Sequence, residues 1–309
     1  MTSGCLMPWF FITSTLSLGF TENLVEFRGL PSFLERSSRS VGSIATAIDD
    51  YPFMASIRFA GKHICGGSIL TKSIILTAGH CVDPEDKRDL WYVKVGDADM
   101  NFRGSWHKVE RMLRHDKYQR FELSEDGDHQ LINDVGLIQL SDPIEIDNMT
   151  TKTIELFKEN NDINNYTSGI LTGWGNIPEV VLLYKQDTKE NSIQYGKTRK
   201  LEPPSKLRAV ELNIGTEDMC ALINPKAILE NQFCTHTLGK LPCSGDSGSP
   251  LVVNGSLAGI FSWGDLRCNE GLNTGYFTDV AKYRKWIDDW VHELGYMNIQ
   301  NYQSSEERN

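Results

Sequence analysis

Short runs of β-branched and aromatic residues, separated by turn residues, recur along this 309-residue chain and set the strongest limit on its fold. Runs of this length and spacing, rich in Val and Ile, are typical of antiparallel strands in an all-β barrel or sandwich. We predict strands at residues 53–59, 73–77, 91–95, 135–140, 169–174, 250–253 and 257–263. The predicted fold class is therefore all-β.

One segment has the period of a helix. In residues 280–294, large apolar side chains recur at steps of three and four, which places them on one face of a helix. The members of this face are Tyr283, Trp286, Ile287, Trp290, Val291 and Leu294. Gly295 is a typical helix stop, so we predict that the helix ends there and that residues 296–309 form a polar, frayed tail.

The composition is that of a folded and acidic protein. Hydrophobic residues make up 40% of the chain and aromatic residues 10%, which argues against general disorder. The formal net charge is −10 and the isoelectric point is about 5.2. This balance disfavours nucleic acid and anionic membrane as partners.

Residues 1–19 have the character of a secretory signal peptide. Residues 6–19 are an apolar stretch too short and too early to span a membrane, and Ser17 and Gly19 fit the small-residue rule for cleavage before Phe20. The start of the segment lacks the Lys or Arg of most signals. No later segment has the roughly 18 uninterrupted apolar residues of a membrane helix, so we expect a secreted, extracellular protein with no membrane partner.

The cysteines fit an exported chain. Seven are present, and Cys5 lies in the predicted signal, so six remain. An even number predicts disulfides, against the alternative of free thiols in a cytosolic protein. Three Asn-x-Ser/Thr sites, at Asn148, Asn165 and Asn254, are candidate glycosylation acceptors in such a compartment.

Three segments carry the residue types of nucleophilic catalysis. Ser247 lies in Cys-Ser-Gly-Asp-Ser-Gly-Ser-Pro, where glycines allow two backbone N–H groups to point at one oxygen. His80 lies upstream in Leu-Thr-Ala-Gly-His-Cys, and Asp134 in Asn-Asp-Val-Gly-Leu-Ile. A serine hydroxyl needs a base within hydrogen-bond reach, and the order His, Asp, Ser is that of chymotrypsin-type proteases.

Together these segments resemble the trypsin/chymotrypsin-like serine proteases over residues 40–295. The resemblance implies two packed six-stranded antiparallel β-barrels with the active site between them. It implies a serine endopeptidase that is made as a zymogen and needs no cofactor. The implied partners are polypeptide substrates, an activating trypsin-like protease and protein inhibitors, and the implied state is a monomer.

The resemblance also implies roles for single residues. Ser247 is the expected nucleophile, His80 the general base and then acid, and Asp134 the group that orients the imidazole. The amides of Gly245 and Ser247 are the expected oxyanion hole. The implied disulfides are Cys65–Cys81, Cys220–Cys234 and Cys243–Cys268.

Activation is a further expectation from the resemblance. In the family, cleavage after a basic residue frees an amine that pairs with the aspartate before the nucleophile. Here Arg39 precedes Ser40-Val-Gly-Ser, so residues 20–39 are the expected propeptide and the Ser40 amine pairs with Asp246. Serine replaces the usual isoleucine, so less apolar surface is buried around this pair. The loss of that side-chain burial costs the activated form about 1.5–3 kcal/mol. A rival cleavage after Arg36 puts the Val-Gly pair out of register.

The substrate pocket departs from that of trypsin. The family's pocket floor falls on Leu241, and an aliphatic floor cannot compensate a buried cation. With Gly264 and Gly275 as wall glycines, we expect apolar or aromatic side chains on the acyl side of the cut. Ser262, Trp263 and Gly264 match the strand that pairs with the substrate backbone, and barrel packing is the alternative role for Trp263.

Several residues keep other interpretations open. Asp97 and Asp99 lie where some relatives bind calcium, but we see no matching downstream acids and expect solvated carboxylates with no metal. Ser249 stands where the family has a glycine, and a positive φ there would cost about 1–2 kcal/mol. Together with Ser40 and Leu241, Ser249 leaves a weak or inactive homologue that binds proteins as the alternative.

Two stretches are longer than the family pattern. The first has its surplus at residues 120–132 and, by resemblance, overhangs the substrate cleft. The second includes the Lys-rich residues 178–204 and, by resemblance, is a loop often nicked by proteolysis. Long loops without structure of their own are usually functional or disordered, and an unselected surface insertion is the alternative for each.

Overall fold

The computed structural model describes residues 43–83, 88–101, 103–122, 129–187, 192–202, 204–225, 227, 229–238, 240, 242–264 and 274–306. For residues 177–187, 192–202 and 296–306 it describes the backbone alone. The predictions made for residues 1–19 and 20–39, and for Arg39, Ser40, Leu241 and Cys268, lie outside the described residues.

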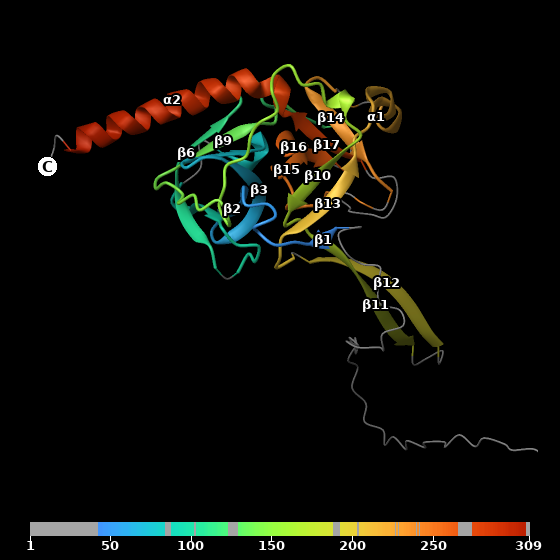
Figure 1. The fold of residues 1–309 in the computed structure, drawn as a ribbon. Helices are drawn as coiled ribbons and strands as arrows, with labels where there is room; N and C mark the ends of the chain where they lie inside the picture. Colours follow the sequence, from blue (N-terminus) through green and yellow to red (C-terminus); the bar gives the residue numbers. More distant parts are fainter. Residues whose placement is uncertain are drawn as a thin grey trace, which may run out of the picture. The chain divides into compact units, whose positions relative to one another are not determined.

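The first part of the fold is a closed six-stranded barrel, as predicted (Figure 1). In spatial order its strands are β2 (Met54–Phe59), β3 (Lys62–Thr71), β4 (Ile74–Thr77), β9 (Gly136–Leu140), β6 (Ser105–Arg114) and β5 (Trp91–Val95). Its interior is filled by aliphatic side chains such as Ile57, Ile69 and Ile138, all fully buried.

The second part is a seven-stranded antiparallel sheet that curves into a half-barrel. Its order is β1 (Ile44–Ala45), β13 (Arg208–Asn213), β10 (Ser168–Gly173), β15 (Pro250–Val253), β16 (Ser256–Gly264), β17 (Thr274–Asp279) and β14 (Gln232–His236). A single bridge between Ile214 and Thr235 connects the end of β13 to β14. The predicted second barrel is therefore present as a half-barrel. It has seven strands where six were predicted, and a single bridge joins its two ends in place of a full strand pairing.

The predicted strand segments are all strands, with ends shifted by one residue at most. They correspond to β2, β4, β5, β9, β10, β15 and β16. Apolar and β-branched side chains in these runs pack on both faces of the strands, as their preference for half-buried and buried strands predicts.

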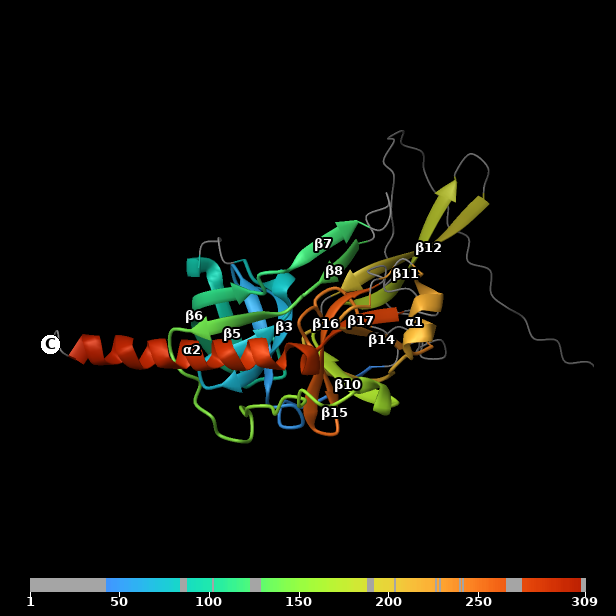
Figure 2. The same ribbon diagram turned by 90° about the horizontal axis from the view of Figure 1, so that it is seen from above.

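The C-terminal helix α2 (Val280–Glu306) follows β17 directly (Figures 1 and 2). Its predicted apolar face is correct, because Tyr283, Ile287 and Leu294 are buried in the core cluster of the first barrel. The predicted stop at Gly295 is wrong, since the helix continues through it. A glycine inside a helix costs only about 1 kcal/mol relative to alanine, so a single glycine does not by itself end a helix.

Both long stretches contain a hairpin of their own. In the first, β7 (Gln119–Glu122) pairs with β8 (His129–Ile132). In the second, β11 (Ile177–Asp187) pairs with β12 (Ser192–Glu202), and residues 181–187 and 192–198 belong to a separate compact unit. The described parts of both stretches therefore have secondary structure of their own.

Short helices and disulfides complete the fold. The short helices are η1 (Gly79–Cys81), η2 (Arg88–Leu90), η3 (Ile163–Asn165) and α1 (Glu217–Ile223). The expected pairs Cys65–Cys81 and Cys220–Cys234 are both formed. Cys243 is also in a disulfide, whose expected partner lies outside the described residues. None of the helices in the described part of the chain is long and apolar enough to span a membrane.

Candidate active site

His80 lies in η1, which begins just after strand β4. The Cys65–Cys81 disulfide joins the next residue to β3, so the histidine is anchored to the first barrel on both sides. Its side chain remains 24% exposed and can meet a ligand from solvent.

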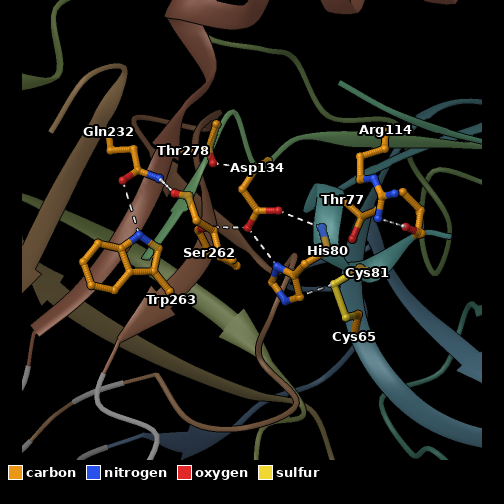
Figure 3. A network of polar contacts seen from close by, with 12 residues as sticks. Cys65, Thr77, His80, Cys81, Arg114, Asp134, Gln232, Ser262, Trp263 and Thr278 are labelled. Carbon is orange, nitrogen blue, oxygen red and sulfur yellow. Dashed lines mark hydrogen bonds and ion pairs between the residues drawn. A yellow bond between two sulfur atoms is a disulfide. The ribbon is translucent and has the colours of Figure 1, made fainter. Parts of the chain in front are cut away.

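Asp134 follows strand β8 and is fully buried beside His80 (Figure 3). One carboxylate oxygen accepts the backbone N–H of His80 at 2.7 Å, and the other accepts its ring Nδ1 at 2.8 Å. The two bonds fix both the main chain and the ring of the histidine. Asp134 therefore holds the imidazole of His80 in one orientation.

The second sheet holds Asp134 from the opposite side. Ser262 on β16 donates its hydroxyl to Oδ2 of Asp134 at 2.5 Å, and Thr278 on β17 donates to the Asp134 backbone carbonyl at 2.8 Å. The sequence assigned Ser262 only to substrate binding and did not identify Thr278. A buried carboxylate requires such donors, because a charge left without them is costly in the interior.

Asn133, just before Asp134, has a φ of 52° and is held by two hydrogen bonds. Its Oδ1 accepts the hydroxyl of Tyr283 on α2 at 2.8 Å, and its Nδ2 donates to the backbone carbonyl of Lys117 at 2.7 Å. A left-handed conformation is unfavourable for most residues and least so for Asn. These bonds therefore stabilise the bend that presents Asp134.

Ser247 lies in a tight turn against the first barrel. Gly245 and Gly248, on either side of it, have φ values of 98° and 77°, which favour glycine. The Ser247 carbonyl accepts the N–H of Gly66 at 2.7 Å, and a Cβ on Gly248 would lie 2.1 Å from Oγ1 of Thr77. The turn is thus packed directly on the strands that precede and support His80.

The turn leaves two backbone donors open. Within the described residues, the N–H groups of Gly245 and Ser247 have no acceptor, as an oxyanion hole requires. Nε2 of His80 lies 3.7 Å from Sγ of Cys81, and the described residues form no hydrogen bond between His80 and Ser247 Oγ. Catalytic hydrogen bonds are often long or poorly aligned before substrate binds, so the lack of this bond does not argue against either residue.

Asp246 is buried beneath the same turn. Its carboxylate accepts the N–H of Gly175 at 2.7 Å and that of Cys243 at 2.9 Å. Burial raises the pKa of Asp246 to about 6, and these N–H donors oppose that rise. In the described part of the chain, no cationic side chain pairs with it.

His63 on β3 is a site residue that the sequence did not reveal. Its ring bonds the carbonyl of Gly245 through Nε2 at 2.9 Å and the hydroxyl of Ser56 through Nδ1 at 2.8 Å. Burial lowers the pKa of His63 to about 4, so the ring is neutral at pH 7. Nε2 therefore donates to Gly245, and Nδ1 accepts from Ser56. A lone histidine in a strand carries no pattern that predicts these contacts.

Ser249 does not strain the backbone. The described non-glycine residues with positive φ are Ala60, Asn133, Asn148, Asn231 and Asn254. Ser249 is not among them, so the cost that a positive φ would bring does not arise there. Its fully buried hydroxyl instead has no hydrogen-bond partner among the described residues.

The strand expected to pair with substrate is Ser262–Gly264 at the end of β16. Strand β15 pairs only with residues 256–260, so it does not cover this end. Trp263 is 5% exposed and belongs to a buried cluster, which supports the packing role left open for it. A Cβ on Gly264 would lie 2.8 Å from the carbonyl of Thr274, and one on Gly275 would lie 2.9 Å from Cγ of Pro242.

The two candidate calcium ligands bond to the protein itself. Oδ1 of Asp97 accepts the N–H of Asp99, and Oδ1 of Asp99 accepts the N–H of Asn101. The ammonium of Lys94, 2% exposed, donates to the Asp99 carbonyl. We expected both carboxylates to be free in solvent, but both residues are half-buried and both carboxylates accept backbone N–H groups.

One further group in the described residues has metal-ligand spacing, formed by Cys65, His80 and Cys81. Its two sulfurs are joined in a disulfide and offer no thiolate. The candidate glycosylation sites Asn148, Asn165 and Asn254 are all exposed. The first and third have positive φ in turns, and Asn165 ends η3.

The chain is similar to known proteins over most of its length. The Trypsin family profile matches residues 40–287. Hypodermin-B of Hypoderma lineatum is 33% identical over 254 residues, which cover 81% of this chain and 87% of the relative. Trypsin delta of Drosophila erecta is 31% identical over 252 residues, with the same two coverages.

A solved structure supports the fold. Neuropsin, described as a serine protease expressed in the limbic system of mouse brain, matches with a TM-score of 0.62 at 24% identity. The match covers 82% of this chain and 98% of that structure. The chain therefore belongs to the trypsin family of serine proteases.

Proposed function

We propose that this chain is a secreted serine endopeptidase, made as a zymogen, that uses Ser247, His80 and Asp134. The contact that carries the proposal is the 2.8 Å hydrogen bond between Nδ1 of His80 and the buried Asp134 carboxylate. Because Nδ1 donates to Asp134, the neutral ring keeps a lone pair on Nε2. That is the form a general base requires.

In the proposed reaction, Ser247 Oγ attacks the substrate carbonyl while Nε2 of His80 takes its proton. Asp134 stabilises the imidazolium that results. The N–H groups of Gly245 and Ser247 receive the oxyanion, and each such donor contributes about 3–4 kcal/mol in comparable sites. His80 then returns the proton to the leaving amine, and water releases the acyl group by the same route.

The environment of Asp246 supports activation by cleavage after Arg39. A buried carboxylate needs a compensating charge, and the described residues supply only backbone N–H groups. The amine freed at Ser40 would supply that charge and lower the pKa of Asp246 from its raised value. Since the cut follows an arginine, a trypsin-like protease is the proposed activator.

For specificity, we infer apolar or aromatic side chains on the acyl side of the cut. Leu241 carries this inference, and the Pro242 ring beside Gly275 adds apolar surface to the same region. The open end of β16 at Ser262–Gly264 offers an edge to which an extended substrate backbone can add. The proposed partners are polypeptide substrates and protein inhibitors of a monomeric enzyme.

Export and glycosylation belong to the same proposal. The even cysteine count outside the predicted signal and two formed disulfides fit an oxidising compartment. The three Asn-x-Ser/Thr asparagines are exposed and so accessible to the transferase. We propose an extracellular glycoprotein.

A serine-directed phosphonate tests the catalytic proposal. Protein cleaved after Arg39 is treated with an aryl phosphonate, and labelling is located by mass spectrometry of peptides. We expect labelling at Ser247, none in the Ser247→Ala variant, and a drop of about 10⁴-fold or more in kcat/KM for Asp134→Asn. Digestion of a peptide library by the same preparation should give cuts after apolar or aromatic residues.

The alternative has its own outcome in this experiment. Folded and correctly processed protein that takes no label would support a non-catalytic homologue that binds proteins through the cleft. Dominant cutting after Lys or Arg would instead overturn only the specificity assigned to Leu241.

A further inference from the structure

Gln232, at the start of β14, has a buried side chain whose amide is used at both ends. Nε2 donates to the backbone carbonyl of Leu131 at 2.6 Å. Oε1 accepts the indole N–H of Trp263 at 3.3 Å (Figure 3). Gln232, which belongs to neither strand, thus connects β8 with β16 through its side chain. The two strands are over 100 positions apart in the chain.

The two residues joined by Gln232 belong to the segment before Asp134 and to the end of β16 that β15 does not cover. Leu131 is in the β7–β8 hairpin, three residues before Asp134. Trp263 lies between Ser262, which bonds Asp134, and Gly264 at the open end of β16. Of these three β16 residues, Trp263 alone has a large side chain, so it is the apolar surface nearest an added substrate strand.

That apolar surface is closed. The Trp263 ring is stacked on Tyr276 with centroids 3.8 Å apart and planes at 4°. Leu131 packs in the same cluster and is 2% exposed, against 5% for Trp263. Tyr276 therefore covers one face of the Trp263 ring. Gln232 bonds the β7–β8 hairpin at Leu131, whose side chain packs in the same cluster.

We propose that Gln232 is a specificity-determining residue that anchors the β7–β8 hairpin over Trp263. With the anchor in place, the Trp263 surface is closed to bulky side chains that precede the cleaved residue. The favoured substrates are peptides with small side chains at the two to three positions before it. This inference rests on the proposed peptidase function.

Gln232→Met tests the anchor, because Met has similar length and no hydrogen-bonding group. The change removes both hydrogen bonds made by Gln232, so the hairpin loses its tie to the indole N–H of Trp263. We expect amide hydrogen exchange in residues 119–122 and 129–132 to become about tenfold faster. Gln139→Met, which also replaces a buried glutamine, is the matched control and should leave this exchange unchanged.

The second measurement is substrate selectivity. We expect kcat/KM for peptides with aromatic side chains before the cleaved residue to rise about fivefold in Gln232→Met, relative to a single-residue ester that touches only the pocket and the catalytic groups. Gln139→Met should not change this ratio. Faster exchange with an unchanged ratio would overturn the specificity role, and unchanged exchange would overturn the anchor.

The two measurements separate this inference from the proposed function. An inactive wild-type protein would overturn the peptidase and, with it, the selectivity assigned to Gln232. Exchange in the hairpin needs no activity, so it still decides whether Gln232 anchors β7–β8.

Discussion

At position 249, a serine side chain fills space between two glycines. A Cβ on Gly66 would lie 2.1 Å from the Ser249 Oγ, and one on Gly173 would lie 2.8 Å from it. The side chain is fully buried, and its hydroxyl has no hydrogen-bond partner among the described residues. A buried polar group without a partner costs about 1–3 kcal/mol. The serine therefore weakens the fold through its hydroxyl and not through its backbone.

Replacing Ser249 by alanine should raise stability. Ser249→Ala removes the hydroxyl and keeps the Cβ, so we expect the free energy of unfolding to rise by about 1 kcal/mol. Ser249→Gly also removes the hydroxyl but adds chain entropy to the unfolded state, so its gain should be smaller. Guanidinium unfolding of the three proteins measures the difference. Loss of stability in Ser249→Ala would mean that the hydroxyl has a partner, such as a bound water.

At the scale of elements, helix α2 acts on the catalytic segment. Tyr283 in its first turns bonds Asn133, whose φ of 52° sets the path into Asp134. Its ring also packs against His115 on the chain that leads to β7, with centroids 5.4 Å apart. The helix thus contributes to the position of Asp134 as well as to the core.

Tyr283→Phe should reduce catalysis more than stability. It removes the hydrogen bond to Asn133, worth about 1 kcal/mol, and keeps the ring. Because Asn133 loses a bond that supports its conformation, we expect kcat to fall about fivefold with KM unchanged, and the pH profile of kcat to shift. Steady-state kinetics across pH measures both.

Lys285→Ala on the same helix is the control for Tyr283→Phe. It breaks only an exposed ion pair with Asp289 and should leave kcat unchanged. Equal loss of kcat in the two variants would show that α2 docking, and not the Tyr283 hydroxyl, is responsible.

At the scale of the whole molecule, buried titratable groups set opposing responses to acid. Burial raises the pKa of Asp246 and that of Asp279 to about 6. The folded chain then binds these protons more tightly than the unfolded chain, so both groups stabilise the fold at low pH and lose that effect as pH rises from about 4 to about 6. His63 acts in the other direction, because burial lowers its pKa to about 4.

The His63 contribution can be isolated by difference. Its stabilising effect is complete above about pH 6.5 and is lost as pH falls toward 4, since the unfolded ring takes up a proton first. From the direction and size of the shift, we expect wild type to lose about 3 kcal/mol relative to His63→Gln over this range. Urea unfolding of uncleaved chains in a Ser247→Ala background measures the difference. Asp246→Asn should show a difference of opposite sign, and equal slopes for all three would contradict the assignment.

The strands and the segments around His80, Asp134 and Ser247 could be predicted because each is recognisable over a few residues. A run such as residues 91–95 forms a strand in any context that buries it. The glycines of Gly-Asp-Ser-Gly can adopt the positive φ that a tight turn needs, so this segment predicts its own turn. Gly295 shows where such local rules fail. The helix continues through it, because its effect on a helix is small.

Local sequence by itself determined the all-β class, the apolar face of α2 and the residue types available for nucleophilic catalysis. Only the tertiary structure decided that Ser262, Thr278, Tyr283 and Gln232 converge on the segment 131–134, that His63 bonds Gly245, and that Ser249 is unstrained. The reason is physical. Strand and turn preferences act between neighbours in the chain, whereas the partner of a buried polar group is whatever the packed fold places within about 3 Å of it.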